Sequence, residues 1–324
     1  MSFQNPFLLS LGWSEFFQSS FEKFMSDHPA TAFAPALIVS QGRGSYRVLV
    51  KPELILEAYV TGKLHKVATD GAGFPAVGDW AAITLSEGNR KAEIHHVLPR
   101  KSLVQRRRVG NKYENQIIAA NVDFLVIVTS LNEDFDLERL GRYIALGQES
   151  GVTPVLVLTK TDLCLRPQEY IAKINSKFPN VNLFAITDRD PTSFETLQVL
   201  FSPGMASVLV GSSGIGKSTL CNFLIRGDSQ KTSEVSTDSR GKHTTTARSL
   251  LITRWGGLVI DTPGMQEVAV VGEVAAEKFP DIDDLILKCK FTNCRHGEDP
   301  GCAVVRAIKD GFLDLKRWQT YRAK

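Results

Sequence analysis

Gly211-Ser212-Ser213-Gly214-Ile215-Gly216-Lys217-Ser218 is the stretch that decides the fold. It follows the apolar run SVLVG and precedes the run TLCNFLI, so the pattern GxxxxGK[ST] lies between an expected strand and an expected helix. Glycines let consecutive backbone N–H groups turn inward around phosphate oxygens, and the helix presents its positive end to the same anion. We therefore expect a phosphate-binding loop in which Lys217 reaches the β- and γ-phosphates and Ser218 ligates Mg²⁺.

The residues on both sides of this loop predict a parallel sheet. Five apolar runs alternate with helical segments, at 123–131, 153–160, 181–187, 206–211 and 257–262. Continuous apolar strands of this kind are typical of a sheet covered by helices on both faces. The expected fold of this part of the chain is therefore an α/β P-loop domain.

The last of these strands ends in a second candidate phosphate contact. Asp261-Thr262-Pro263-Gly264 follows the run WGGLVI. A carboxylate at this place can hold Mg²⁺ through its hydration shell, and the Gly264 N–H can contact a γ-phosphate.

A third motif indicates which base is bound. Thr159-Lys160-Thr161-Asp162 ends the run PVLVL, where a carboxylate can accept from both guanine N1–H and the 2-amino group, and the lysine stem can lie over the base. The tetrapeptide resembles the NKxD motif of GTPases, with Thr159 in place of asparagine. Ile186-Thr187-Asp188 follows the next strand, where it matches their fifth, SA-like motif poorly.

The order of the motifs is inverted. Ordinary small GTPases have the phosphate loop first and the base-reading motif last. Here residues 159–162 precede 211–218, which precede 261–264. This order predicts a circular permutation. The residues expected to bind the nucleotide are Thr159, Lys160, Asp162, Gly211, Ser212, Ser213, Gly214, Ile215, Gly216, Lys217, Ser218, Thr219, Asp261 and Gly264.

The segment RGKHTTT, residues 240–246, is polar and contains a glycine, as a mobile loop does. It lies where a switch loop supplies a threonine to Mg²⁺ and the γ-phosphate. His243 is a candidate for orienting the attacking water, and a surface histidine without a catalytic role is the alternative. Met265 cannot polarise water, so slow intrinsic hydrolysis is expected.

Residues 1–100 follow different patterns. Residues 1–32 predict one amphipathic helix, with phenylalanines at helical spacing, that packs on its own domain. Five short alternating runs with turn signals then follow between 33 and 100, and they predict a small closed β-barrel. SQGRGSY and SEGNRK predict two of its hairpin turns.

The net charge of +3 conceals a basic cluster. Residues 90–112 carry eight Lys/Arg against one acid, whereas 1–89 carry six against eight and 113–324 carry 24 against 26. Residues 288–324 add nine basic against four acidic residues. Such clusters indicate a polyanionic partner, although charge runs are more often solvated surface.

Four potential metal ligands lie close together near the C-terminus: Cys289, Cys294, His296 and Cys302. Three thiolates and an imidazole suit a closed, tetrahedral Zn²⁺ site without room for a catalytic water. A segment this short cannot build its own core, so we expect one structural zinc per chain that stabilises its fold. Cys164 and Cys221 are interpreted as packing residues.

Composition narrows the class of protein. Of 324 residues, 43% are hydrophobic and 23% charged, which excludes global disorder. No run approaches 18 apolar residues and the first residues lack a secretory pattern, so we expect neither a membrane span nor a signal peptide. Five cysteines, three of them clustered, favour a reducing cytosol.

These motifs together resemble the ribosome small-subunit-dependent GTPases of the RsgA/YjeQ type. The resemblance covers nearly the whole chain: SQGRG, FPAVGDW and LPRKS, then TKTD, GSSGIGKS, RGKHTTT and DTPG in permuted order, then the Cys/His spacing. It implies an OB-type barrel, a GTPase domain and a zinc-knuckle domain that act together on the maturing small ribosomal subunit. It also implies Thr245 as the threonine that ligates Mg²⁺ alongside Ser218.

The expected organisation is an N-terminal helical extension (1–32), an OB-fold RNA-binding domain (33–110), a circularly permuted GTPase domain (111–273) and a small α-helical zinc-knuckle domain (274–324). The expected activity is hydrolysis of GTP to GDP and phosphate, stimulated by the small ribosomal subunit and its rRNA, by a cytoplasmic monomer. A permuted GTPase acting on a non-ribosomal partner is the alternative. An RNA-binding protein with a degenerate nucleotide site is disfavoured because Lys217, Ser218 and Asp261 are intact.

Overall fold

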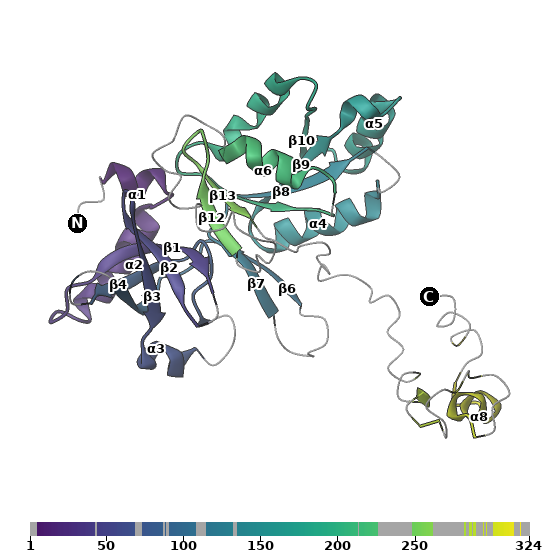
Figure 1. Cartoon of the computed structure of the whole chain (residues 1–324), viewed down its shortest axis with the longest axis horizontal. Coiled ribbons are helices and arrows are strands. Elements are labelled where there is room, and N and C mark those ends of the chain that lie inside the picture. Colours follow the sequence, from purple (N-terminus) through teal and green to yellow (C-terminus); the bar gives the residue numbers. More distant parts are fainter. Residues whose placement is uncertain are drawn as a thin grey trace. The chain divides into compact units, whose positions relative to one another are not determined.

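The structure is a computed structural model of the chain. It describes residues 5–225 and 248–261, with gaps at 43, 69–72, 87, 89–90, 108–114, 132–134 and 213. Further on it describes residues 282, 285–286, 288–289, 294, 296, 301–313 and 318. The chain divides into two compact units, Met1–Val271 and Gly272–Lys324, which are taken separately below (Figure 1).

Two helices open the first unit, where the sequence predicts one. α1 (Pro6–Ser10) and α2 (Glu15–Ser26) are separated by Gly12, whose φ of +87° ends the first helix. A Cβ at Gly12 would lie 3.2 Å from the carbonyl oxygen of Gly204, so this close approach also favours glycine. Trp13 and Phe17 are buried against Trp80 of the barrel. The N-terminal extension therefore packs on the barrel through aromatic contacts.

Five strands close into a barrel where the sequence predicts one. They are β1 (Ala34–Gln41), β2 (Tyr46–Lys51), β3 (Leu54–Val60), β4 (Trp80–Leu85) and β5 (Lys91–Val97), with α3 (Gly62–Val67) between β3 and β4. Pairing runs β1-β2-β3-β5-β4 and back to β1, with β3 and β5 parallel and the other pairs antiparallel. The predicted OB-type barrel is confirmed.

A second set of strands forms the parallel sheet. They are β8 (Phe124–Ser130), β9 (Thr153–Thr159), β10 (Asn182–Ala185), β11 (Ala206–Val210) and β13 (Leu258–Asp261), in the order β10-β9-β8-β11-β13. All four pairings between these neighbours are parallel. The chain moves outward from β8 to β10 and then returns to the other side of β8, so β8 and β11 form the switch point where open α/β sheets bind ligands.

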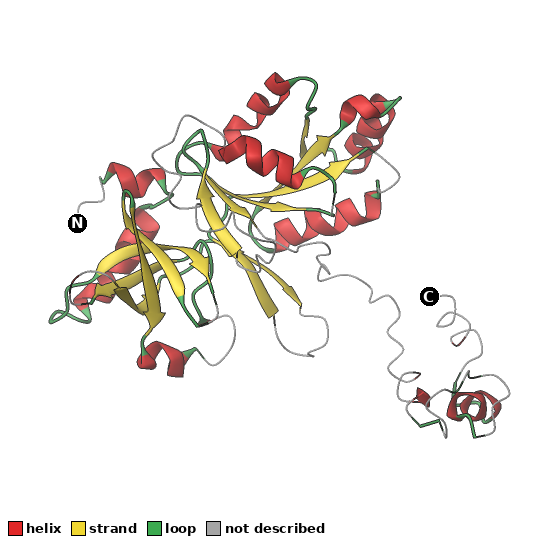
Figure 2. Cartoon of the chain, in the orientation of Figure 1, coloured by secondary structure: helices red, strands yellow, loops and turns green. Residues whose placement is uncertain are grey.

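Helices cover both faces of this sheet (Figure 2). They are α4 (Leu137–Glu149), α5 (Pro167–Lys177), the 3-10 helices η3 (Thr161–Leu163) and η4 (Pro191–Phe201), and α6 (Lys217–Ile225). Along β8, Leu125 belongs to the apolar cluster that contains Leu140 of α4, whereas Val126 belongs to the cluster that contains Leu197 of η4 and Leu220 of α6. This alternation explains why the strands read as continuous apolar runs.

One further strand joins the barrel to the sheet. β12 (Arg248–Ile252), which the sequence does not predict, pairs antiparallel with β13 on one side and with β1 on the other. Its Ser249 lies opposite both Asp261 and Ser40. The barrel and the parallel sheet are therefore parts of one hydrogen-bonded sheet.

Two strands stand outside that sheet. β6 (Leu103–Arg107) and β7 (Asn115–Ala120) form a separate antiparallel ribbon, which contains part of the basic segment 90–112 (Figure 1). Gln105 of β6 lies opposite Ile117 of β7, so the two strands of the ribbon come from either side of the domain boundary expected at residue 110.

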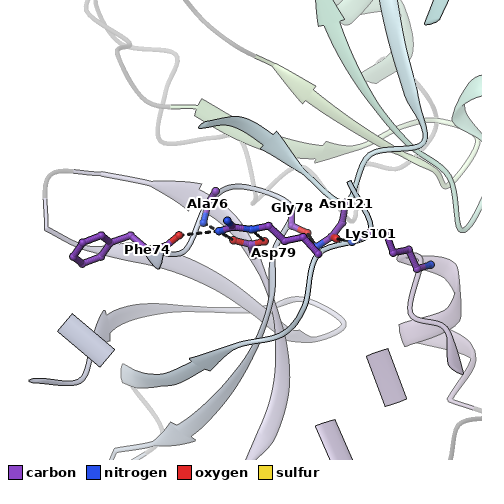
Figure 3. A network of polar contacts seen from close by, with 7 residues as sticks. Phe74, Ala76, Gly78, Asp79, Lys101 and Asn121 are labelled. Carbon is purple, nitrogen blue, oxygen red and sulfur yellow. Dashed lines mark hydrogen bonds and ion pairs between the residues drawn. The ribbon is translucent and has the colours of Figure 1, made fainter. Parts of the chain in front are cut away.

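A polar network connects the loop before β4 to the chain on either side of this ribbon (Figure 3). Arg100 donates from Nε and Nη2 to the Asp79 carboxylate, at 2.8 and 2.7 Å, and from Nη2 to the Phe74 carbonyl at 2.9 Å. Asn121 donates to the Gly78 carbonyl at 3.0 Å. Burial raises the pKa of Asp79, and the hydrogen bonds and charge of Arg100 oppose that shift.

The second unit is small and centred on one helix. α8 (Ala303–Lys309) begins directly at Cys302, the last of the four candidate metal ligands. The buried apolar side chains around it are Ile282, Val304, Ala307, Leu313 and Trp318. The predicted zinc-knuckle domain is thus helical in the part that the structure describes.

Among the described residues, no helix combines the length and the apolar character needed to cross a membrane.

Candidate nucleotide and metal sites

The phosphate loop leaves the buried strand β11 and enters α6. Gly211 has a φ of +137°, and a Cβ there would lie 2.3 Å from the Val128 carbonyl oxygen, which only glycine avoids. Gly214 and Gly216 also have positive φ values, of +75° and +100°. Strand, glycine-rich turn and helix therefore follow one another as the phosphate-binding arrangement requires.

Lys217 lies at the start of α6, with its side chain folded over the loop. Its ammonium donates to the carbonyl oxygen of Gly211 at 2.7 Å and to that of Ser212. Burial lowers the pKa of Lys217, and the negative charge of Asp261 partly restores it. The carboxylate that ends β13 is therefore close enough to act on the lysine of the phosphate loop.

The TKTD turn is tied to the phosphate loop by its first two residues. Thr159 Oγ1 donates to the Ile215 carbonyl oxygen at 2.5 Å, and Lys160 Nζ donates to the Gly214 carbonyl oxygen at 2.8 Å. Lys160 has a φ of +54°, a left-handed conformation that is uncommon outside glycine and is concentrated at functional sites. The two motifs thus meet although about fifty residues separate them in the sequence.

The Asp162 carboxylate accepts from two side chains of the segment after β10. Thr187 Oγ1 donates to Asp162 Oδ1 at 2.6 Å, and Arg189 Nε lies 3.0 Å from Asp162 Oδ2. These contacts lower the pKa of Asp162, with the Thr187 hydrogen bond as the main cause. The carboxylate is therefore ionised and orientated at neutral pH. Sequence reasoning noted Thr187 as a poor motif match and gave no signal for Arg189, because no local pattern shows which side chains meet across a sheet edge.

A small cavity lies between the two motifs. Its volume is about 30 Å³, and it is lined by Thr159, Lys160, Ile186, Thr187, Asp188, Phe194, Gly216 and Thr219. A cavity of this volume has room for water but not for a purine base.

Four expected site residues lie outside the described residues: Ser213, His243, Thr245 and Gly264. Met265 also lies outside them. The described site residues at this sheet edge come from the end of β9, from η3 and its N-cap, from the phosphate loop, from α6 and from the end of β13.

The four candidate metal ligands of the second unit converge. Their ligand atoms all lie within 4.8 Å of one another. His296 Nδ1 lies 3.5 Å from Cys289 Sγ and 3.7 Å from Cys302 Sγ, and the two sulfurs are 3.9 Å apart. In a tetrahedral Zn²⁺ site with bonds of about 2.0–2.3 Å, neighbouring ligand atoms lie roughly 3.5–3.8 Å apart. The residues therefore fit a metal ion with four ligands.

Local structure holds this cluster in place. Cys302 caps the N-terminus of α8, where its Sγ accepts from the Val305 N–H at 3.5 Å. His296 has a φ of +59°, and its ring packs edge-on against Trp318 with centroids 5.8 Å apart. Burial raises the pKa of Cys289, but the backbone N–H groups of Ala303 and Val304 outweigh it and lower the pKa overall. The cluster can therefore hold a metal ion.

A phosphate loop at the switch point, preceded in the sequence by the TKTD turn, is the arrangement of a circularly permuted GTPase. A model of the family described as "RsgA GTPase" matches residues 97–271. The chain belongs to this family and is a GTP-hydrolysing enzyme.

Named relatives extend over nearly the whole chain. The protein named "Small ribosomal subunit biogenesis GTPase RsgA" of Opitutus terrae is 39% identical over 97% of this chain and 88% of its own. "Small ribosomal subunit biogenesis GTPase RsgA 2" of Vibrio vulnificus is 35% identical over 99% of this chain and 88% of its own. Family membership therefore rests on similarity over nearly the whole chain and not on the motifs alone.

Solved structures support the fold. The crystal structure of "YloQ, a circularly permuted GTPase", is similar with a TM-score of 0.53 and 24% identity, and the similarity covers 91% of this chain and 95% of that one. The structure of YjeQ from Thermotoga maritima gives a TM-score of 0.55 and 23% identity over 90% and 97% of the two chains. The permuted fold predicted from the sequence is therefore confirmed.

Proposed function

We propose that this GTPase binds the small ribosomal subunit and assists its late maturation, and that the subunit stimulates its turnover. The observation that carries the proposal is the junction of the two motifs, where Thr159 and Lys160 bind phosphate-loop carbonyls beside Asp162. The names of the relatives, which specify small-subunit biogenesis, supply the partner.

Within this proposal, Asp162 selects guanine and Lys160 covers the base. The carboxylate is half-buried and ionised, so it offers acceptors to the N1–H and 2-amino donors. Backbone N–H groups of Gly211, Ser212, Ser213, Gly214, Ile215 and Gly216, with Thr219, would surround the phosphates. Lys217 would exchange its loop carbonyls for phosphate oxygens.

The proposed Mg²⁺ ligands are Ser218, Thr245 and, through water, Asp261. The ion would supply neutralisation of charge on the phosphates during transfer. Asp261 and Lys217 are electrostatically coupled in the structure, which supports their placement at one site. Gly264 would add a backbone N–H for the γ-phosphate.

The proposed catalytic residues are His243, which would orient water, and Thr245. We expect slow turnover by the free enzyme and acceleration on the order of a hundredfold or more with subunits, as in other partner-activated GTPases. His243→Ala should abolish most of the stimulated rate and leave GTP affinity nearly unchanged, because the imidazole is not a phosphate ligand. Thr245→Ala should weaken the GTP-bound state itself.

The RNA-binding surface is assigned to the accessory parts. The basic segment 90–112 supports this assignment, but its Arg100 is held by the buried Asp79. The other cations of that segment, with those of residues 288–324, are the proposed contacts to rRNA phosphates. Zn²⁺ is the proposed metal of the Cys/His cluster, because three thiolates and an imidazole in closed geometry suit it.

The deciding experiment is GTP turnover with and without purified small subunits, with filter binding of rRNA in the presence of GTP or GDP. Stimulation and GTP-dependent binding are expected. Turnover unaffected by subunits, with no rRNA retained, would overturn the ribosomal assignment and favour a permuted GTPase with another partner.

The proposed partner places the reaction in the cytoplasm, and a monomer is expected. The four-domain division at residues 32, 110 and 273 is part of the same proposal.

A further inference from the structure

A guanidinium holds the carboxylate proposed to recognise the base. Arg189 Nε lies 3.0 Å from Asp162 Oδ2, while Thr187 occupies Oδ1. Guanine would present two N–H donors to this same carboxylate, so the arginine and the base use the same acceptor. We propose that Arg189 is a latch on the base site: it competes with guanine for Asp162, and its displacement sets the affinity for the nucleotide. This inference rests on the proposed role of Asp162.

The backbone that carries the latch is fixed. Asp190 N donates to the Thr187 carbonyl at 3.1 Å, and Ser193 Oγ accepts from Thr187 N at 3.1 Å. Asp190 also caps the helix η4 by accepting from Thr192 N at 3.0 Å. The backbone of Arg189 is therefore held near Asp162 by a short, well-bonded turn.

The side chain, in contrast, is free to leave. Arg189 is 73% exposed, whereas Asp162 is 18% exposed. A water-exposed guanidinium keeps its hydration when it swings away, but a sheltered carboxylate without donors loses hydrogen bonds. Release of Arg189 is thus favourable only when other donors replace it at Asp162, and guanine brings such donors.

The Thr187 hydrogen bond does not compete in the same way. A carboxylate has about four lone-pair positions, and a small hydroxyl on Oδ1 leaves one of them and the space beside it for the base, whereas the larger guanidinium on Oδ2 also fills that space. Thr187 thus orientates Asp162 both with and without bound nucleotide, whereas Arg189 occupies Asp162 only when no nucleotide is bound.

The test compares GDP affinity of the wild type and Arg189→Ala by fluorescence titration at low ionic strength. We expect the variant to bind GDP about two- to fivefold more tightly, the range of one exposed ion pair. The direction is decisive, because loss of a nearby positive charge would otherwise weaken binding of an anion. The difference should shrink towards zero at about 0.5 M salt, where exposed ion pairs are screened.

Arg166→Ala is the matched control. Arg166 is also exposed, pairs with a carboxylate at 3.2 Å (Glu169), and has no contact with Asp162 in the described structure. Its replacement removes the same charge and should leave GDP affinity unchanged. GDP affinity of Arg189→Ala that equals or falls below that of the wild type would overturn the latch.

A double-mutant cycle separates the latch from the proposed function. Asp162→Asn should weaken GDP binding, and Arg189→Ala should add nothing in that background. If Asp162→Asn weakens GDP binding but Arg189→Ala does not tighten it in the wild type, the latch alone is wrong. If Asp162→Asn leaves GDP affinity unchanged, base recognition by Asp162 is wrong and the latch fails with it.

Discussion

Thr159 links two motifs through one hydroxyl group. Where the NKxD motif has asparagine, this chain has a threonine whose Oγ1 reaches the Ile215 carbonyl oxygen at 2.5 Å. A Cβ atom added at Gly216 would lie 3.5 Å from the Thr159 side chain, so the phosphate loop passes close to this threonine. The Thr159 hydroxyl therefore ties the turn that is proposed to recognise the base to the phosphate loop.

Changing that acid should change the base that is preferred. Asp162→Asn replaces one acceptor with an amide donor, which can pair with the additional carbonyl of xanthine. We expect GDP affinity to fall by at least tenfold and XDP affinity to rise, measured by competition against a fluorescent nucleotide. Equal binding of ADP and GDP by the wild type would contradict the role of the TKTD turn.

Arg100 has a structural role that its sequence context conceals. It lies in the basic segment, yet its side chain is 14% exposed and bonds a completely buried carboxylate, Asp79. Such a pair does little for stability as a whole, but removal of one partner leaves an uncompensated buried charge.

Arg100→Ala should therefore lower the free energy of unfolding of the first unit by about 3–5 kcal/mol, measured by urea denaturation. Asp79→Leu combined with Arg100→Met removes both charges and should lose much less. If the single and double variants lose equal stability, packing and not the ion pair explains the effect.

At the scale of elements, the sequence predicts strands that bury both faces or alternate strictly. The five barrel strands and the five parallel strands lie where their apolar runs indicate. The glycines of the phosphate loop and the Cys/His spacing are equally local signals, and their residues converge in the structure.

Other elements could not be predicted because their own sequences give a weak signal. β12 is a five-residue strand that forms a hairpin with β13 across residues 253–257 and pairs on its other side with β1, far earlier in the sequence. β6 is rich in arginine, so its charge masks its strand character, and it forms because β7 pairs with it. The break between α1 and α2 depends on close approach of Gly12 to Gly204, which phenylalanine spacing does not reveal.

The contact of α2 with the barrel should depend on pH. Phe24 of α2 stacks on His96 of β5, with centroids 4.7 Å apart and rings 4° from parallel. Burial lowers the pKa of His96, and the nearby charge of His28 lowers it further. The folded protein thus keeps this ring neutral where the unfolded chain, with a pKa near 6.5, takes up a proton.

The unfolded state binds more protons below pH 6.5, so this histidine makes the protein less stable as the pH falls through and below that value. We expect the melting temperature of the wild type to fall more steeply between pH 7 and pH 5 than that of His96→Phe, which retains an aromatic ring against Phe24. Parallel profiles would show that His96 does not contribute to the pH dependence. Shifts from buried carboxylates such as Asp79 cancel in this comparison.

At the scale of the whole molecule, the two units have separate sources of stability. The first has extensive apolar clusters on both faces of its sheet, whereas the part of the second unit that the structure describes has one small cluster around α8. A small unit of this kind commonly depends on a metal ion for its fold.

Elemental analysis should find about one Zn per chain. Cys294→Ala, or treatment with a chelator, should unfold the second unit and leave GDP binding intact, observed as loss of amide protection confined to residues 272–324. Folded protein without metal, in which the three cysteine thiols of the cluster react freely, would contradict the structural role. Chelation that also abolishes GDP binding would contradict the independence of the units.

The pairing of β12 with β1 has a mechanical consequence. β12 begins at Arg248, immediately after residues 226–247, and its other neighbour β13 carries Asp261. β12 thus lies between the barrel strand β1 and the strand β13, about 5 Å from each of them. Force applied at the start of β12 passes into the barrel through main-chain hydrogen bonds, which most side-chain substitutions leave in place and proline removes. Side chains on β12 can therefore change in evolution while the main-chain hydrogen bonds that connect the barrel to the parallel sheet are kept.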